Sequence, residues 1–280
     1  MLRMMRIIAA DFFGLVRVCG LAVALRWLMA IAMNFKKCVR ARNLQPADIA
    51  MGIGPFAARL GQARAKVFGE QAISGIREIW VRDVYLNRER LSIPPTGTVV
   101  DLGANMGNFT VLALSHGAGV RCVSVEGDPR MVEKLQKNIE ANGWQSRCAI
   151  CTKFIGETTE VQRQLQNETG GEHEDRFISE AEFVRQYDLE RIDFLKCDIE
   201  GSEFGLLRPG SLLLGMARQL AVELHAWGGD VKQFIAMLRD EGFDVDVASE
   251  QADGAIVQAK RIGQRRAPVG PQAGVSHAVA

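Results

Sequence analysis

The 280-residue sequence lacks the cysteine pattern of a zinc site or of a disulfide-stapled fold. Its six cysteines are scattered, and the single CxxC pair, Cys148 and Cys151, has no second pair to complete four metal ligands. In an extended segment, a spacing of three places the two thiols on opposite faces. We therefore interpret the cysteines as buried thiols of a reducing compartment, which predicts a cytoplasmic location.

A hydrophobic run long enough to span a membrane is also missing. Residues 7–33 are rich in apolar side chains, but Arg17 and Arg26 interrupt them, and a spanning helix needs roughly 18 or more apolar residues. Arg26 also argues against the apolar core of a signal peptide. We expect an apolar helix that either packs against the body of the protein or lies on a membrane surface.

An excess of charge of one sign is absent, since the net charge is +1. The chain therefore lacks the basic balance of a nucleic-acid-binding protein, and its acidic body offers no track for phosphates. Residues 1–45, in contrast, carry eight cations against Asp11 alone, a net charge of +7. This basic end predicts either a solvated helix face or a peripheral contact with the inner face of a membrane, with the four cations between Lys36 and Arg42 near the headgroups.

The apolar pattern divides the chain into three parts. Residues 1–92 have helical spacing without strand alternation, and the prolines at 94–95 end that region. Residues 93–262 alternate apolar runs with amphipathic segments, which predicts an α/β fold with a doubly wound, mostly parallel sheet. The Gly- and Pro-rich residues 263–280 predict a disordered tail.

The second part contains all the expected strands of the sheet. In such a sheet, ligands bind beyond the carboxyl ends of the strands. The expected strands cover residues 98–102, 120–126, 149–155, 192–197, 219–224, 243–248 and 255–258. The expected helices cover residues 109–115, 131–142, 181–190, 203–214 and 231–241.

The segment 101–109, Asp-Leu-Gly-Ala-Asn-Met-Gly-Asn-Phe, joins the first of these strands to a helix through a glycine turn. Gly103 and Gly107 have no Cβ, so the backbone can approach a ligand closely, and the amides that open the helix favour a carboxylate. Asp101 can meet an ammonium or sulfonium charge. A cofactor with an amino acid and a sulfonium fits this mixture better than a pyrophosphate does. A dinucleotide-dependent oxidoreductase is the alternative, although the spacing differs from G-x-G-x-x-G.

Two acids follow at the end of the second strand. Glu126 lies 19 residues after Gly107, where an acid can accept hydrogen bonds from both hydroxyls of a ribose. We therefore predict that Glu126 binds the cofactor. Asp128 precedes Pro129, a pattern typical of a helix N-cap with proline at the first helical position.

A second group of polar residues lies where two later strands end. Asp198 and Glu200 follow an apolar strand, and their mutual repulsion needs a cation, a substrate or a shared proton to offset it. Glu203 has a simpler role as a first-turn acid favoured by the helix dipole. The next strand ends at His225, whose reference pKa of roughly 6.5 suits a general base. We predict His225 as the base and the two acids as orienting groups; a divalent cation held by Asp198 and Glu200 is an open alternative.

The order of these motifs resembles the FkbM-like methyltransferases over about residues 97–258. The residues that carry the resemblance are 101–107, Glu126-Gly-Asp-Pro129, Asn138, Asn142, Lys196-Cys-Asp-Ile-Glu-Gly-Ser-Glu203 and Glu223-Leu-His225. Gly127 departs from the family pattern, in which a proline follows the glutamate. The first 90 residues match no family that we can name.

This resemblance implies a class I, Rossmann-like fold with an N-terminal helical extension, and S-adenosylmethionine as cofactor. It implies a cofactor set and an acceptor set of residues. The cofactor set is Asp101, Gly103, Asn105 and Glu126; the acceptor set is Asp198, Glu200 and His225. The expected reaction is methylation of a hydroxyl on a small-molecule, glycan, lipid-linked or polyketide-type acceptor. A non-catalytic membrane-surface scaffold with a relict fold is the remaining alternative, and the oligomeric state is not predicted.

Overall fold

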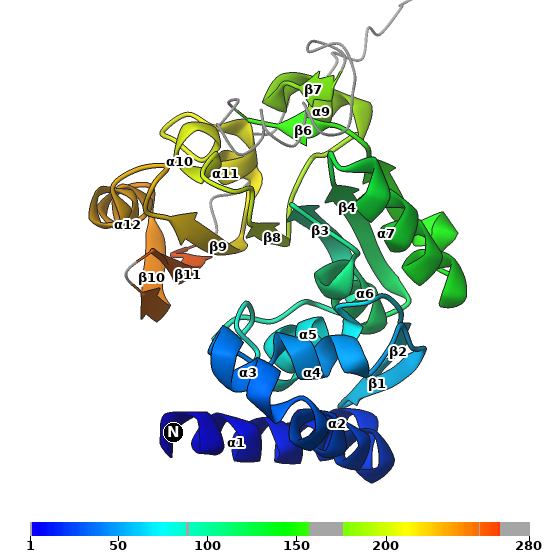
Figure 1. The fold of residues 1–280 in the computed structure, drawn as a ribbon. Helices are drawn as coiled ribbons and strands as arrows, with labels where there is room; N and C mark the ends of the chain where they lie inside the picture. The colour runs from blue at the N-terminus through cyan, green and yellow to red at the C-terminus, as the bar shows by residue number, and fades with distance from the viewer. Residues whose placement is uncertain (1, 88–89, 157–175, 252, 264–280) are drawn as a thin grey trace, which may run out of the picture.

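The computed structural model describes residues 2–87, 90–156, 176–251 and 253–263 (Figure 1). The expected disordered tail, except Gly263, lies outside these residues, and so does most of the polar stretch 157–176. None of the described helices is long and apolar enough to cross a bilayer.

A seven-stranded sheet with the order β10-β11-β9-β8-β3-β4-β5 forms the centre of the molecule. The five strands from β9 to β5 are parallel, and β10 and β11 join the β9 edge in antiparallel orientation. This arrangement confirms the predicted mostly parallel sheet. The strands are β3 (Thr96–Leu102), β4 (Gly119–Val125), β5 (Cys148–Cys151), β8 (Phe194–Cys197), β9 (Gln219–His225), β10 (Phe243–Gln251) and β11 (Gly254–Arg261).

Both faces of the sheet are covered, as the doubly wound prediction requires. Successive residues of a strand point to opposite faces, and in β3 Val99 belongs to one apolar core whereas Val100 belongs to the other. The first core joins α6 (Asn108–Ser115), α7 (Pro129–Ala141) and the N-terminal region. The second contains α9 (Glu180–Gln186), α11 (Leu212–Met216) and α12 (Val231–Asp240).

Two predicted elements are interrupted in the structure. The single helix expected over 203–214 is wrong, because Pro209 and Gly210, with φ of 84°, separate α10 (Glu203–Leu206) from α11. The strand expected over 149–155 ends at Cys151. Its last part forms β6 (Phe154–Ile155), which pairs with β7 (Phe177–Ile178) in a separate small sheet.

The N-terminal region is not entirely helical, so that prediction is wrong. It contains α1 (Leu2–Cys19), α2 (Leu21–Met33), α3 (Phe35–Ala41), α4 (Gln45–Ala50), α5 (Ala72–Gly75) and the π-helix η1 (Ile76–Val81). Between α4 and α5, β1 (Phe56–Leu60) and β2 (Ala63–Val67) form an antiparallel hairpin. Three of its buried positions are alanines: Ala58, Ala63 and Ala65. Because alanine is the residue that most favours a helix, the alternation of buried and exposed residues typical of a strand is weak in this part of the sequence.

Buried ion pairs attach the first helices to the rest of the protein. The guanidinium of Arg77, in η1, donates to Asp11 of α1 at 2.7 Å and to Asp48 of α4 at 2.5 Å. Arg82 also donates to Asp11, at 2.6 Å, and the indole of Trp27 in α2 donates to Asp48 at 2.7 Å. Every donor and acceptor in this group therefore depends on a partner from another segment.

Two asparagines, Asn138 in α7 and Asn142 at the C-cap of that helix, contact the hairpin and the residue after it. The side chain of Asn138 accepts from the Phe68 amide at 2.7 Å and donates to the carbonyls of Phe68 and Met106, at 3.0 and 2.8 Å. Asn142 makes the same two-way contact with the backbone of Lys66, at 2.8 Å each way. Asn138 thereby joins three segments: α7, the chain after β2 and the glycine turn after β3.

Candidate cofactor and acceptor site

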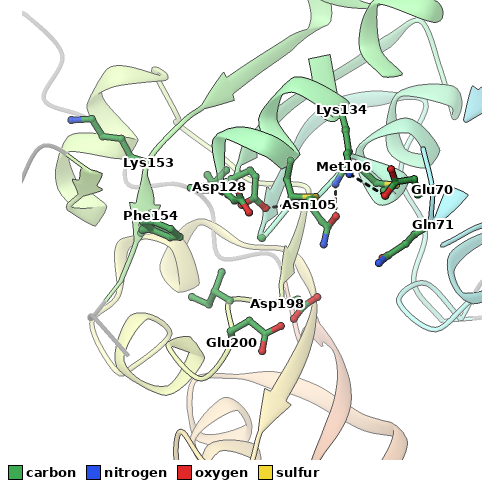
Figure 2. A pocket seen from close by; sticks show the side chains of 17 residues that line it. Glu70, Gln71, Asn105, Met106, Asp128, Lys134, Lys153, Phe154, Asp198 and Glu200 are labelled. Carbon is green, nitrogen blue, oxygen red and sulfur yellow. Dashed lines mark hydrogen bonds and ion pairs between the residues drawn. The ribbon is translucent and has the colours of Figure 1, made fainter. Parts of the chain in front are cut away.

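A cavity of about 270 Å³ opens at the carboxyl ends of β3, β4 and β8 (Figure 2). The glycine turn, the end of β4 and the segment after β8 supply most of its wall, and Glu70 and Gln71 from the N-terminal region complete one side. The remaining lining residues are Gly103, Asn105, Met106, Val125, Glu126, Gly127, Asp128, Met131, Lys134, Lys153, Phe154, Ile155, Asp198, Ile199 and Glu200. Five of the eight predicted site residues therefore line the cavity, and three do not: the lining includes Gly103, Asn105, Glu126, Asp198 and Glu200 but not Asp101, Gly107 or His225.

The two glycines of the turn have different functions. Gly103 lines the cavity, has φ of 71°, and would place a Cβ 1.7 Å from the Asp198 carbonyl oxygen. Gly107 has φ of 88°, and its Cβ would lie 2.4 Å from Leu135 of α7. Gly107 is not among the residues that line the cavity, so its small size serves the packing of α7 in the described structure. Asn105 lies between them with φ of 51°, a conformation that asparagine tolerates.

Asp101 lies beneath the turn, fully buried, and does not line the cavity. Its carboxylate accepts from the Thr110 hydroxyl at 2.6 Å and lies 3.4 Å from the ammonium of Lys196. That ammonium also donates to the Gly103 carbonyl at 2.7 Å. Burial lowers the pKa of Lys196, but the charges of Asp101 and Asp198 outweigh it and raise the pKa, so the cation stays charged and fixes the turn.

Glu126 lines the cavity, where the sequence placed a ribose-binding acid. One carboxylate oxygen accepts from the Asn105 amide and the other from the Asp128 amide, both at 2.8 Å. Burial raises the pKa of Glu126, and the two amides oppose that shift. Asp128 caps α7 by accepting from the Arg130 amide at 2.9 Å, so its predicted role as an N-cap is confirmed.

The three predicted acceptor residues come together at the other side of the cavity. Asp198 and Glu200 line it (Figure 2), and Nε2 of His225 lies 3.9 Å from an Asp198 oxygen and 3.7 Å from a Glu200 oxygen. On its other side, Nδ1 of His225 lies 3.0 Å from Oε1 of Glu203. The ring of Trp227 packs against the imidazole with 4.5 Å between centroids.

This environment changes the protonation of His225. Burial lowers its pKa, but the hydrogen bond and charge of Glu203 and the charges of Asp198 and Glu200 raise it to about 9. The imidazole is therefore a cation at neutral pH. Burial also raises the pKa of Glu200, against the attraction of His225.

Two further residues belong to this cluster: Tyr85, which the sequence did not indicate, and Glu223, which is part of the family motif but had no predicted role. The hydroxyl of Tyr85 donates to Glu223 of β9 at 2.8 Å and lies 3.5 Å from Asp198. Burial, followed by the charges of Asp198 and Glu223, raises the pKa of Tyr85 well above its usual value. Glu223 lies two residues before His225 on the same strand, which is a usable signal. Nothing in the sequence near Tyr85 indicates its position.

Glu203 is more than a first-turn acid. It is fully buried, and its Oε1 accepts from the amides of Ile199 and Gly201, at 2.9 and 3.2 Å, besides facing His225. Among the described residues, Asp198, Glu203 and His225 form the group whose donor atoms lie within 4.8 Å of one another, close enough for one cation. Glu200, which the sequence paired with Asp198 for this purpose, is not in that group.

The mostly parallel sheet, with a glycine turn after β3 and an acid at the end of β4, has the arrangement of a Rossmann-like fold. A family model described as the methyltransferase FkbM domain matches residues 101–245, just over half of the chain. The chain therefore belongs to the FkbM methyltransferase family.

Individual known proteins match more distantly. The AMB antimetabolite synthetase AmbE of Pseudomonas aeruginosa is 26% identical over 227 residues, and a tRNA wybutosine-synthesizing protein 2 homolog of Danio rerio is 42% identical over 53 residues. These matches cover 62% and 19% of this chain, but the chain spans only 11% and 13% of the length of those proteins.

Solved structures with a similar chain path include two proteins in complex with S-adenosyl-L-methionine or S-adenosyl-homocysteine. Aeropyrum pernix fibrillarin in complex with S-adenosyl-L-methionine is 18% identical, with a TM-score of 0.40, over 61% of this chain and 69% of that one. M. capricolum TrmK in complex with S-adenosyl-homocysteine is 10% identical, with a TM-score of 0.41, over 60% and 63%.

Proposed function

We propose that this methyltransferase methylates a hydroxyl oxygen of a small-molecule, glycan, lipid-linked or polyketide-type acceptor. The observation that carries the proposal is the cluster of Asp198, Glu200 and His225 beside the cofactor cavity. A hydroxyl is a weak nucleophile until a base removes its proton, and this cluster supplies carboxylates for that purpose. The similarity to a segment of an antimetabolite synthetase agrees with a small-molecule acceptor.

The cofactor is proposed to bind between the glycine turn and Glu126. The carboxylate of Glu126 is already oriented by two backbone amides and keeps lone pairs for the hydroxyls of a ribose. Gly103 leaves room for the backbone to meet the amino-acid part. Asp101 is proposed to act indirectly, because it holds Lys196, which in turn holds the turn. When bound, S-adenosylmethionine supplies a methyl group on a positively charged sulfur.

The carboxylate of Glu200 is proposed as the proton acceptor. The sequence indicated His225, but an imidazole that is protonated at neutral pH has no lone pair for a proton. A carboxylate whose pKa is raised by burial is a stronger base than an ordinary one. His225, as a cation, then holds the acids in place, and Asp198 orients the acceptor hydroxyl. The remaining catalysis is positioning of the oxygen in line with the methyl group.

The pH dependence of methyl transfer tests these assignments. The measurement is formation of S-adenosylhomocysteine from a panel of hydroxyl-bearing acceptors, with kcat/KM followed from pH 6 to 10. If Glu200 is the base, Glu200→Gln lowers kcat/KM by about 100-fold, and the wild-type rate falls as His225 loses its proton near pH 9. A rate that instead rises through pH 9 would return the role of base to His225.

Two further outcomes are informative in the same assay. If EDTA abolishes the activity and Mg²⁺ or Mn²⁺ restores it, Asp198 would be a ligand of a divalent cation and would not act on the acceptor hydroxyl alone. A folded protein that binds S-adenosylhomocysteine by calorimetry but methylates no acceptor of the panel would contradict the hydroxyl class. A protein that binds no cofactor would favour the scaffold interpretation.

A further inference from the structure

The outer face of α2 and the start of α3 is apolar, although it is exposed. Six large side chains on this face have exposed fractions from 40% to 86%: Leu21, Leu25, Leu28, Met29, Met33 and Phe35. The five from α2 follow the i, i+4, i+7, i+8, i+12 spacing of one side of a helix. The opposite side carries the buried residues Ala24, Trp27 and Ile31. We call the exposed side the α2 face; α1 and α2 lie at the periphery of the molecule (Figure 1).

The exposed charged side chains of α1, α2 and α3 and of the α3 C-cap are all positive. Arg17, Arg26, Lys36, Lys37, Arg40 and Arg42 are exposed, and none of them forms an ion pair within the described part of the chain. The first 50 residues contain only two acids, Asp11 and Asp48. Both are buried and paired with arginines, so no acid from α1 to α4 faces solvent to offset the cations.

We propose that the α2 face docks on the surface of an anionic phospholipid bilayer. An exposed apolar stripe flanked by unpaired cations suits the boundary between acyl chains and negative headgroups. The described helices are too short or too polar to cross the bilayer, so the contact is peripheral. A second copy of this chain fits the face less well, because a symmetric contact would bring two sets of cations together.

Vesicle co-sedimentation of the full-length protein tests the proposal without any need for methyl transfer. The protein should sediment with phosphatidylcholine vesicles that contain phosphatidylserine, release as salt is added, and ignore vesicles of phosphatidylcholine alone. Lys36→Glu/Lys37→Glu should weaken binding at least about tenfold, since each surface-bound cation contributes on the order of a fivefold change. Leu25→Ser/Met29→Ser should weaken it similarly by removing apolar contacts.

The matched control is Lys232→Glu/Arg239→Glu, which reverses two exposed charges on α12 and should leave vesicle binding unchanged. The substituted side chains on the α2 face are solvent-exposed, so circular dichroism and the melting temperature should match the wild type. Wild-type protein that stays in the supernatant at low salt overturns the proposal, and so does equal loss in the control. A dimer in analytical ultracentrifugation that Leu25→Ser/Met29→Ser dissociates would also overturn it, because the face would then bind a second copy.

Discussion

The raised pKa of His225 makes the stability of this protein dependent on pH. The perturbation is His225→Asn, compared with the wild type by urea unfolding from pH 6 to pH 10. In the folded protein the pKa is about 9, against a reference value of roughly 6.5 in the unfolded chain. Because the folded pKa is the higher one, the protonated imidazole stabilises the fold. That stabilisation is fully present below pH 6.5 and is lost as the pH rises through 9.

The magnitude follows from the difference between the two pKa values. At roughly 1.4 kcal/mol for each tenfold change in proton affinity, the two pKa values give at most about 3.5 kcal/mol. The side chain is only 11% exposed, so screening by water removes little of it. The gap in unfolding free energy between wild type and His225→Asn should therefore shrink by about that amount between pH 6 and pH 10. Its size at pH 6 also includes the packing lost on substitution, which does not change with pH.

Two observations would refute this reasoning. The first is a gap that stays constant across the pH range. The second is a ring-proton titration of His225, measured by NMR, with a midpoint near the reference value. As a control, Glu203→Gln keeps the shape of the main partner but removes its charge, so it should move that midpoint downward.

Three other substitutions have defined outcomes. Glu126→Ala should weaken S-adenosylhomocysteine binding by roughly 1.5–3 kcal/mol, the range for hydrogen bonds to a charged group, and unchanged affinity by calorimetry in a folded variant would remove the ribose assignment. Gly103→Ala should lower the melting temperature, because its Cβ would overlap the Asp198 carbonyl oxygen; a melting temperature equal to the wild type would contradict the close packing. Arg77→Leu should lower the free energy of unfolding in urea by about 3–5 kcal/mol, because Asp11 and Asp48 then lose the cation that pairs with their buried carboxylates. A decrease below about 1 kcal/mol would show those acids to be neutral.

Much of the sheet could be predicted from sequence because its strands are short apolar runs that end in acids. Asp101, Glu126 and Asp198 each follow such a run, and the parallel order brings the ends together. The β1–β2 hairpin could not be predicted in the same way, since alanines at its inward positions fit a helix equally well. Pro209 is the signal in the sequence for the break between α10 and α11, because proline cannot continue a helix.

The positions of the candidate site residues could be predicted from the sequence better than their contacts. The sequence predicts that His225 lies at the end of its strand, as the structure has it, yet its protonation depends on a contact with Glu203, 22 residues away. Asp101 looked like a ligand of the cofactor, whereas its orientation depends on Lys196 from another strand. Tyr85 reaches the acids from the N-terminal region. Such roles depend on contacts between distant segments, which periodicity and spacing do not encode.

The contacts of Asn138 have a consequence for local opening of the structure. Its side chain hydrogen-bonds to the Phe68 amide and to the Met106 carbonyl at the same time. If either the chain after β2 or the glycine turn moved away from α7 alone, a polar group of Asn138 would be left unpaired. Hydrogen exchange at the Phe68 amide should then follow the same opening free energy as exchange in the turn. A ligand that fills the cavity and holds the turn would slow exchange at Phe68 as well, although that residue lies outside the cavity wall.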